Sequence, residues 1–136
     1  MKKPKCSDIP KELWPPKDAI EEELDVYRLT RQKEVIIDSD FISLYEIDKN
    51  KGIVKQGLLN DDKYYALSVY EDIDDAIGTM KKFPQKFKDI CKGKTIADEG
   101  CVRVTPSASN YSHRSWWLYE GANPLECFSI MEGIHE

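Results

Sequence analysis

The chain lacks any long hydrophobic run. No window of its 136 residues is apolar over the length that a bilayer-spanning helix needs. The opening Met-Lys-Lys resembles the start of a secretion signal, but Pro4, Asp8, Pro10 and Lys11 interrupt the apolar stretch that such a signal requires. We therefore expect a cytoplasmic protein with no membrane partner.

Recognised catalytic and metal-binding motifs are also missing. The sequence holds no glycine-rich phosphate loop, nucleophile elbow, HExxH or CxxC pattern. Acidic runs at 60–62 and 71–75 are explained by a turn and a helix start, because they lack the glycine and the spaced oxygen ligands of a calcium loop. No zinc-like spacing occurs, and we expect ordinary reduced thiols at Cys6, Cys91, Cys101 and Cys127. The sequence predicts no metal site and, outside an NAD-directed alternative given below, no cofactor.

Positive charge is in short supply. Twenty Lys and Arg residues stand against 25 Asp and Glu, for a net charge of -5. An acidic domain is disfavoured as a binder of duplex nucleic acid. The exception is the segment 1–17, which has five lysines against two acidic residues and four of the seven prolines. We expect it to form a basic, proline-rich, extended arm, docked by Trp14 onto a single domain spanning residues 18–136.

Hydrophobic periodicity predicts a mixture of short helices and strands. The clearest elements are strands at Val26–Thr30 and Tyr64–Tyr70, and a helix capped by Asp72 and limited by Pro84. Shorter helices are expected over 18–24 and 84–92, and over 40–47, where a strand is the alternative. Further strands are expected over 94–97, 101–105, 113–119 and 126–131. This order predicts an α+β domain: a mostly antiparallel sheet, two to four short helices and a C-terminal β-meander.

The segment Ser112–Trp117 concentrates chemistry-bearing side chains. It holds the one histidine away from the end of the chain, next to Arg114 and two adjacent tryptophans. Neighbouring residues of a strand point to opposite faces, so His113 and Trp117 belong to one face, and Arg114 and Trp116 to the other. One tryptophan is expected to fill the core and the other to lie at the surface.

Strand alternation also predicts a functional sheet face. If the apolar side chains of each strand face the core, Arg28, Ser68 and Arg103 project from the opposite face, with His113 or Arg114 beside them according to register. Such a face suits a small anionic ligand with a flat ring, such as a nucleotide. The candidate ligand-binding residues are Arg28, Arg103, His113, Trp117 and Tyr119.

A structural role for the arginines is the alternative. Arginines on the sheet of an acidic protein commonly pair with carboxylates from the covering helices. The carboxylates available for this role are Glu46, Asp74 and Asp75.

The chain resembles known proteins at several short stretches. Val26–Thr30, Asp40–Ser43, Ala66–Val69 and His113 with the tryptophan pair look like a group of small bacterial proteins without an established activity. More distantly, a first strand bearing Arg28 and a second bearing Ser68 before a helix are similar to ADP-ribosyltransferase and RES-type NAD-consuming folds. That resemblance implies an NAD site built from Arg28, Ser68 and, as the acidic residue, Glu132. The serine-rich and paired-glutamate motifs of the transferases are missing.

Three functions follow as hypotheses. The first is a binding domain that recognises a protein partner or a small anionic, nucleotide-like ligand through Arg28, Arg103 and His113. The second is an NAD-directed enzyme, in which Arg28 holds phosphate, Ser68 orients the ribose and Glu132 stabilises developing positive charge. The third is a protein-binding inhibitor or immunity factor whose acidic body faces a basic partner.

Overall fold

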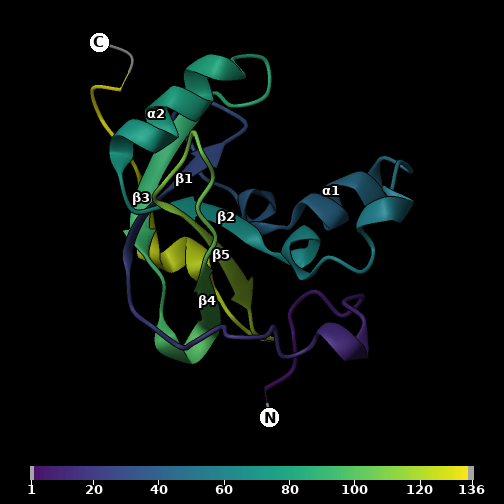
Figure 1. Cartoon of the computed structure of the whole chain (residues 1–136). Coiled ribbons are helices and arrows are strands. Elements are labelled where there is room, and N and C mark those ends of the chain that lie inside the picture. The colour runs from purple at the N-terminus through teal and green to yellow at the C-terminus, as the bar shows by residue number, and fades with distance from the viewer. Residues whose placement is uncertain (1, 135–136) are drawn as a thin grey trace.

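Six strands build one antiparallel sheet in the computed structural model, which describes residues 2–134 (Figure 1). Across the sheet their order is β4-β5-β2-β1-β3-β6. The strands are β1 (Asp25–Thr30), β2 (Leu67–Tyr70), β3 (Asp89–Lys94), β4 (Gly100–Val104), β5 (His113–Leu118) and β6 (Phe128–Ile130). The predicted α+β class with a run of strands at the C-terminal end is confirmed; β4 and β5 are neighbours, and β6 joins β3 at the other edge.

Helix α2 (Ile73–Lys82) confirms the clearest helix prediction. The Asp72 side chain caps it by accepting a hydrogen bond from the backbone N–H of Asp74. Its buried residues Ala76 and Met80 pack on Leu29 and Ile90 of the sheet. The helix ends just before Pro84, which cannot continue it.

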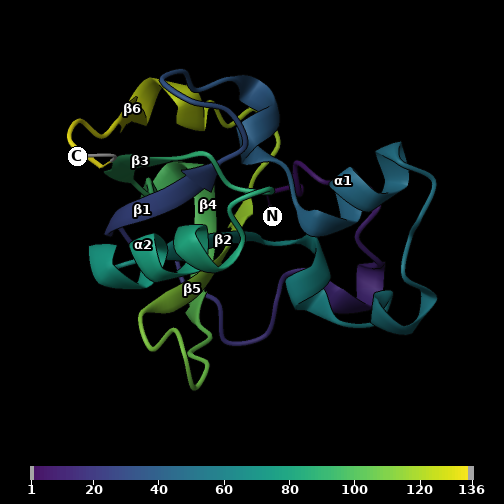
Figure 2. The same cartoon turned by 90° about the horizontal axis from the view of Figure 1, so that it is seen from above.

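The ambiguous stretch 40–47 divides into two helical pieces. A 3-10 helix covers Asp38–Phe41, and α1 (Leu44–Asn50) begins at a capping box in which Ser43 and Glu46 exchange hydrogen bonds. Two more 3-10 helices, Gln56–Leu58 and Asp62–Tyr65, follow α1, and we call residues 44–65 the α1 lobe. This lobe lies beside the sheet, away from α2 (Figure 2). The strand predicted from Tyr64 therefore starts at Leu67.

Two predicted helices are wrong. The segment 18–24 is extended: Ile20 exchanges both backbone hydrogen bonds with Val102, at 2.9 and 2.7 Å, and covers the free edge of β4. The segment 84–92 is a turn followed by β3. Ile90 and Cys91 are both fully buried because both faces of this strand are covered, and two adjacent buried residues imitate a helical pattern.

Gly93 allows β3 and the start of β6 to pack closely. A Cβ at this position would overlap the carbonyl oxygen of Cys127 and the ring of Phe128. The strand predicted over 94–97 instead covers Asp89–Lys94, nearer the N-terminus.

Both faces of β5 are buried at the tryptophan pair, which corrects the prediction that one tryptophan is exposed. Trp116 is 1% exposed in a core that includes Val26, Val69 and Phe128. Trp117, on the other face, is 2% exposed and packs with Tyr65 and other residues near the N-terminal arm. Ser112–Trp117 is thus mostly interior.

The N-terminal arm packs against the core cluster that contains Tyr65 and Trp117. Pro4 bridges to Tyr119, and the Lys5 N–H donates to the carbonyl of Leu118 at 2.9 Å. Trp14 lies edge-on to the ring of Tyr119, with 6.1 Å between ring centroids. Within residues 2–134, no helix combines the length and the apolar character needed to cross a bilayer.

Candidate functional site

The site is built where β1 and β2 separate. The described register between the two strands is a single pair, Tyr27 opposite Tyr70. Past this pair the two strands diverge, and the Arg28 side chain lies between them, where it donates hydrogen bonds to backbone carbonyls. Its Nε donates to the Asp40 carbonyl and its Nη1 to the Ser68 carbonyl, both at 2.7 Å, and its Nη2 donates to Ile42 at 3.3 Å. Burial lowers the pKa of Arg28 to about 10.

The register corrects the predicted sheet face. Ser68, Ser115 and Arg103 lie opposite one another across β2, β5 and β4, so they share a face with His113. Arg28 lies opposite Cys91 and belongs to the other face. Its long side chain nevertheless reaches the gap between the strands, and Arg28 and Ser68 line the same cleft.

This cleft, which we call the basic cleft, has a volume of about 200 Å³. One side comes from β1 and the turn after α2, and the other from α1 and the start of β2. Apolar and aromatic side chains form much of its wall, among them Ile42, Leu44, Ile47, Tyr70 and Phe87. The cations that line it are Arg28, Arg31, Lys63 and Lys86.

Carboxylates compensate the positive charge of the cleft only in part: Lys63 lies 3.5 Å from Asp61, while Arg28, Arg31 and Lys86 have no ion-pair partner among residues 2–134. Asp40 is the one carboxylate among the lining residues, and it accepts hydrogen bonds from the backbone N–H groups of Arg31 and Ile37 and from the Gln32 amide. Burial, followed by repulsion from Arg31, lowers the pKa of Lys86. Because burial destabilises the charged form of this lysine, an anion that enters the cleft would stabilise it.

Ser68 and His113 meet beside the cleft. The Ser68 hydroxyl lies 2.9 Å from His113 Nε2, and the other ring nitrogen, Nδ1, lies 3.0 Å from the Thr105 carbonyl oxygen. Ser68 is exposed, whereas His113 is half-buried, with its ring edge-on to that of Tyr70. The sequence pointed to both residues but not to their contact, because that contact depends on the register of β2 against β5.

The other predicted ligand residues serve the packing of the α1 lobe and the arm. Arg103 forms a bidentate ion pair with Asp62, at 2.8 and 2.6 Å, and lies over the ring of Trp117. The indole N–H of Trp117 donates to the Asp62 carbonyl. Tyr119 donates to Glu21, and burial followed by this bond raises the pKa of Tyr119. None of the three lines the basic cleft.

Glu132 is exposed in the segment after β6 and is not among the residues that line the cleft. The predicted carboxylate partners also differ from those observed. Arg114 pairs with Glu71 at 2.6 Å, while Glu46 caps α1 and Asp75 accepts from Ser112. Two of the three residues that the NAD-site resemblance implies, Arg28 and Ser68, therefore lie together, apart from the third.

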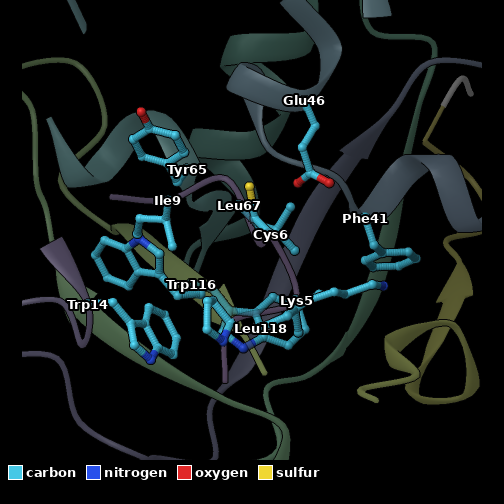
Figure 3. A pocket seen from close by; sticks show the side chains of 12 residues that line it. Lys5, Cys6, Ile9, Trp14, Phe41, Glu46, Tyr65, Leu67, Trp116 and Leu118 are labelled. Atoms are coloured by element: carbon cyan, nitrogen blue, oxygen red, sulfur yellow. The ribbon is translucent and has the colours of Figure 1, made fainter. Parts of the chain in front are cut away.

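A second cavity lies beneath the N-terminal arm. Its lining includes Cys6, Glu46 and both tryptophans of β5, and Figure 3 shows these side chains converging from the arm, α1 and the sheet. At about 20 Å³ it holds roughly one water molecule. Burial, followed by the charge of Glu46, raises the pKa of the Cys6 thiol to about 11, so the thiol is not activated.

Metal ligands do not gather in this fold. Across residues 2–134, no group of three or more His, Cys, Asp or Glu side chains is arranged to hold a metal ion. Comparison of the chain with protein-family models, curated proteins and solved structures gave no match.

Proposed function

We propose that this protein binds a small anionic ligand, carrying phosphate and a flat ring, in the basic cleft. The observation that carries the proposal is the set of four cations around one cavity whose single carboxylate is already engaged. In a chain of net charge -5, a local cluster of positive charge favours the binding of an anion.

The charges differ in what they offer a ligand. Arg28 has five N–H groups and uses three of them on backbone carbonyls, which leaves two for an incoming anion. Arg31 and Lys86 lie over the ring of Phe87, at 5.5 and 5.2 Å from its centroid, with no carboxylate partner among the described residues. These two cations are therefore the most available for phosphate.

The remaining wall suits the rest of a nucleotide-like molecule. Phe87 and Tyr70 present aromatic surface, and the exposed hydroxyl of Ser68 can accept or donate a hydrogen bond. The NAD-directed alternative has less support, because Glu132 does not line the cleft. A protein partner and the inhibitor hypothesis have no comparable feature in their favour among residues 2–134.

Thermal unfolding with added ligands tests the proposal. Pyrophosphate, ATP, NAD and ADP-ribose carry the required charge, and adenosine carries the ring alone. A compound present at 100 times its Kd should stabilise the fold by about 2.7 kcal/mol. We expect a rise in Tm with at least one phosphate compound and little with adenosine.

A double variant locates the binding. Arg31→Ala with Lys86→Ala should weaken the interaction by about 10- to 100-fold, measured by calorimetric titration. The matched control is Lys11→Ala, which removes an exposed positive charge from the arm and should leave affinity unchanged. No stabilisation by any phosphate compound, or equal affinity in the double variant, would refute the proposal.

A further inference from the structure

Ser68 and His113 form a hydroxyl–imidazole pair at the wall of the basic cleft. The Oγ to Nε2 distance is 2.9 Å, within the range for transfer of a proton between a nucleophile and its base. Ser68 lines the cleft from β2, and His113 lies opposite Tyr70 on the neighbouring strand β5. The sheet therefore fixes the relative position of the two side chains.

The contacts of Nδ1 favour one neutral form of His113. Nδ1 lies 3.0 Å from the carbonyl oxygen of Thr105, which can only accept a hydrogen bond, and 2.8 Å from the Thr105 hydroxyl, which can accept or donate one. The form in which Nδ1 carries the proton satisfies the carbonyl and leaves the lone pair on Nε2. In this form the hydroxyl of Ser68 donates to Nε2, which is the arrangement in which histidine acts as a base on serine.

The exposure of Ser68 distinguishes it from a structural serine. Ser115 lies directly opposite it on β5, is 2% exposed and contacts the Thr105 hydroxyl at 2.9 Å. Ser68 points to the same face of the sheet but is exposed and lines the cleft. Its hydroxyl can meet a bound molecule, whereas that of Ser115 cannot.

The protonation state of His113 fits the role of a base. Burial lowers its pKa below the usual 6.5, so the ring is neutral at pH 7. The titratable and charged groups nearest to it are Tyr70 from β2 and Arg114 from its own strand, and the charge of Arg114 acts in the same direction as burial. Among residues 2–134, no carboxylate acts on the ring to raise its pKa.

We infer that Ser68 is a nucleophile and His113 its general base, for acyl transfer from an ester or thioester that carries an anionic group. The inference rests on the proposed function for the place of that anionic group, which Arg31 and Lys86 would hold. The oxyanion that forms would lie beside the positive charge of Arg28, whose Nη1 already contacts the Ser68 carbonyl.

The reaction consists of two balanced transfers. Ser68 Oγ attacks the carbonyl carbon while its proton passes to His113 Nε2, and the leaving alcohol or thiol then takes that proton as its bond to carbon breaks. Water attacks the acyl-serine, gives a proton to Nε2 and releases the acid. The proton on Nε2 returns to Ser68 Oγ, so the protein is regenerated without an oxidant or reductant.

Acylation by a chromogenic ester tests the inference. The intact protein is mixed with 4-nitrophenyl acetate, which is neutral, or with 4-nitrophenyl hydrogen succinate, which is anionic. We expect a burst of one nitrophenolate per chain, a mass gain of one acyl group on Ser68, and faster acylation by the anionic ester. Ser68→Ala should abolish the burst, and His113→Gln should slow it by about 100-fold or more.

The control serine lies on another strand of the same sheet. Ser129 of β6 is exposed, its register with Lys92 places it on the same face, and no histidine within residues 2–134 contacts it. Ser129→Ala should leave the burst unchanged. Because His113→Gln risks altering the fold, the pH profile of the unmodified protein gives an independent measurement: the acylation rate should be level above pH 7 and fall below pH 6.5.

The outcomes separate this inference from the proposed function. Phosphate compounds that bind while Ser68 stays unacylated would overturn the nucleophile and leave the binding proposal standing. Acylation of Ser68 by the neutral ester, without binding of any phosphate compound, would overturn the binding proposal and leave the nucleophile standing. Acylation at another residue, or a rate that rises steadily with hydroxide, would also overturn the inference.

Discussion

Arg28 joins three chain segments through backbone carbonyls. Its guanidinium donates to the carbonyls of Asp40, Ile42 and Ser68, where β1 no longer pairs with β2. A carbonyl left without a donor away from water costs about 1 to 3 kcal/mol. Arg28, which strand alternation predicted as a ligand contact, thus also stabilises the fold by linking these segments.

We expect Arg28→Ala to lower the free energy of unfolding by about 3 kcal/mol, because several carbonyls lose their donor together. Urea denaturation measures the change. The matched control, Arg31→Ala, removes a charge from the same cleft where the guanidinium is recorded only over Phe87, and should cost less than about 1 kcal/mol. Equal losses in the two variants would contradict the structural role of Arg28, whereas the predicted difference makes Arg31 the better probe of ligand binding.

At the scale of elements, local signals predicted some parts of this fold well. Helix α2 carries its own cap, apolar stripe and terminating proline, so its prediction needed nothing beyond its own sequence. Strand β3 could not be predicted in this way, because burial on both faces removes the alternation that identifies a strand. The segment around Ile20 is extended because it pairs with β4, which lies some 80 residues away.

The α1 lobe is fastened to β4 by one ion pair. Asp62, in the last 3-10 helix of the lobe, accepts two hydrogen bonds from Arg103, and both side chains are largely buried. These bonds, followed by the charge of Arg103, lower the pKa of Asp62 below its usual 3.8. The Arg103 guanidinium also lies over the ring of Trp117. Loss of the ion pair should therefore loosen the α1 lobe, which forms one wall of the basic cleft.

This ion pair predicts an acid-sensitive contribution to stability. Above about pH 5, Asp62 is charged in both the folded and the unfolded chain, and the pair contributes fully. As pH falls below 3.8 the unfolded chain takes up the proton first, so the free energy of unfolding decreases. Asp62→Asn should lower stability by about 1 to 2 kcal/mol at pH 7 and by less at pH 3, in denaturant titrations at both values.

The control for this prediction is Asp38→Asn, an exposed carboxylate outside the lobe, which should change stability by less than about 0.5 kcal/mol. A loss in Asp62→Asn that is the same at pH 7 and pH 3 would show that the charge of Asp62 is not responsible.

At the scale of the whole molecule, the site depends on information that strand patterns do not contain. Alternation within β2 and β4 predicted one face for Ser68 and Arg103, and the register confirms it. It left open whether His113 or Arg114 joins them, and the pairing of β5 with β2 shows that His113 does. It failed for Arg28, because the phase of β1 relative to β2 is set by pairing and by burial on both faces. The cations Arg31, Lys63 and Lys86 lie in loops or a one-turn helix, where periodicity says nothing about direction.

We expect the basic arm to unfold together with the domain, although composition sets it apart. Ile9 is 7% exposed and packs in the same cluster as Tyr65 and Trp117. Ile9→Ala should therefore behave as a core truncation and lower the free energy of unfolding by about 2 to 4 kcal/mol, with an unchanged denaturant slope and a single transition. Lys11→Ala, two residues away and exposed, should change stability by less than about 0.5 kcal/mol. If the arm unfolded separately, Ile9→Ala would leave the denaturant midpoint of the main transition unchanged and add a second transition of low slope at lower denaturant concentration. Tryptophan fluorescence of a variant with Trp116→Phe and Trp117→Phe, in which Trp14 alone reports the arm, is compared with far-UV circular dichroism of the same variant, which reports the sheet and helices. Coincident transitions show one cooperative unit, and separate transitions show an appendage.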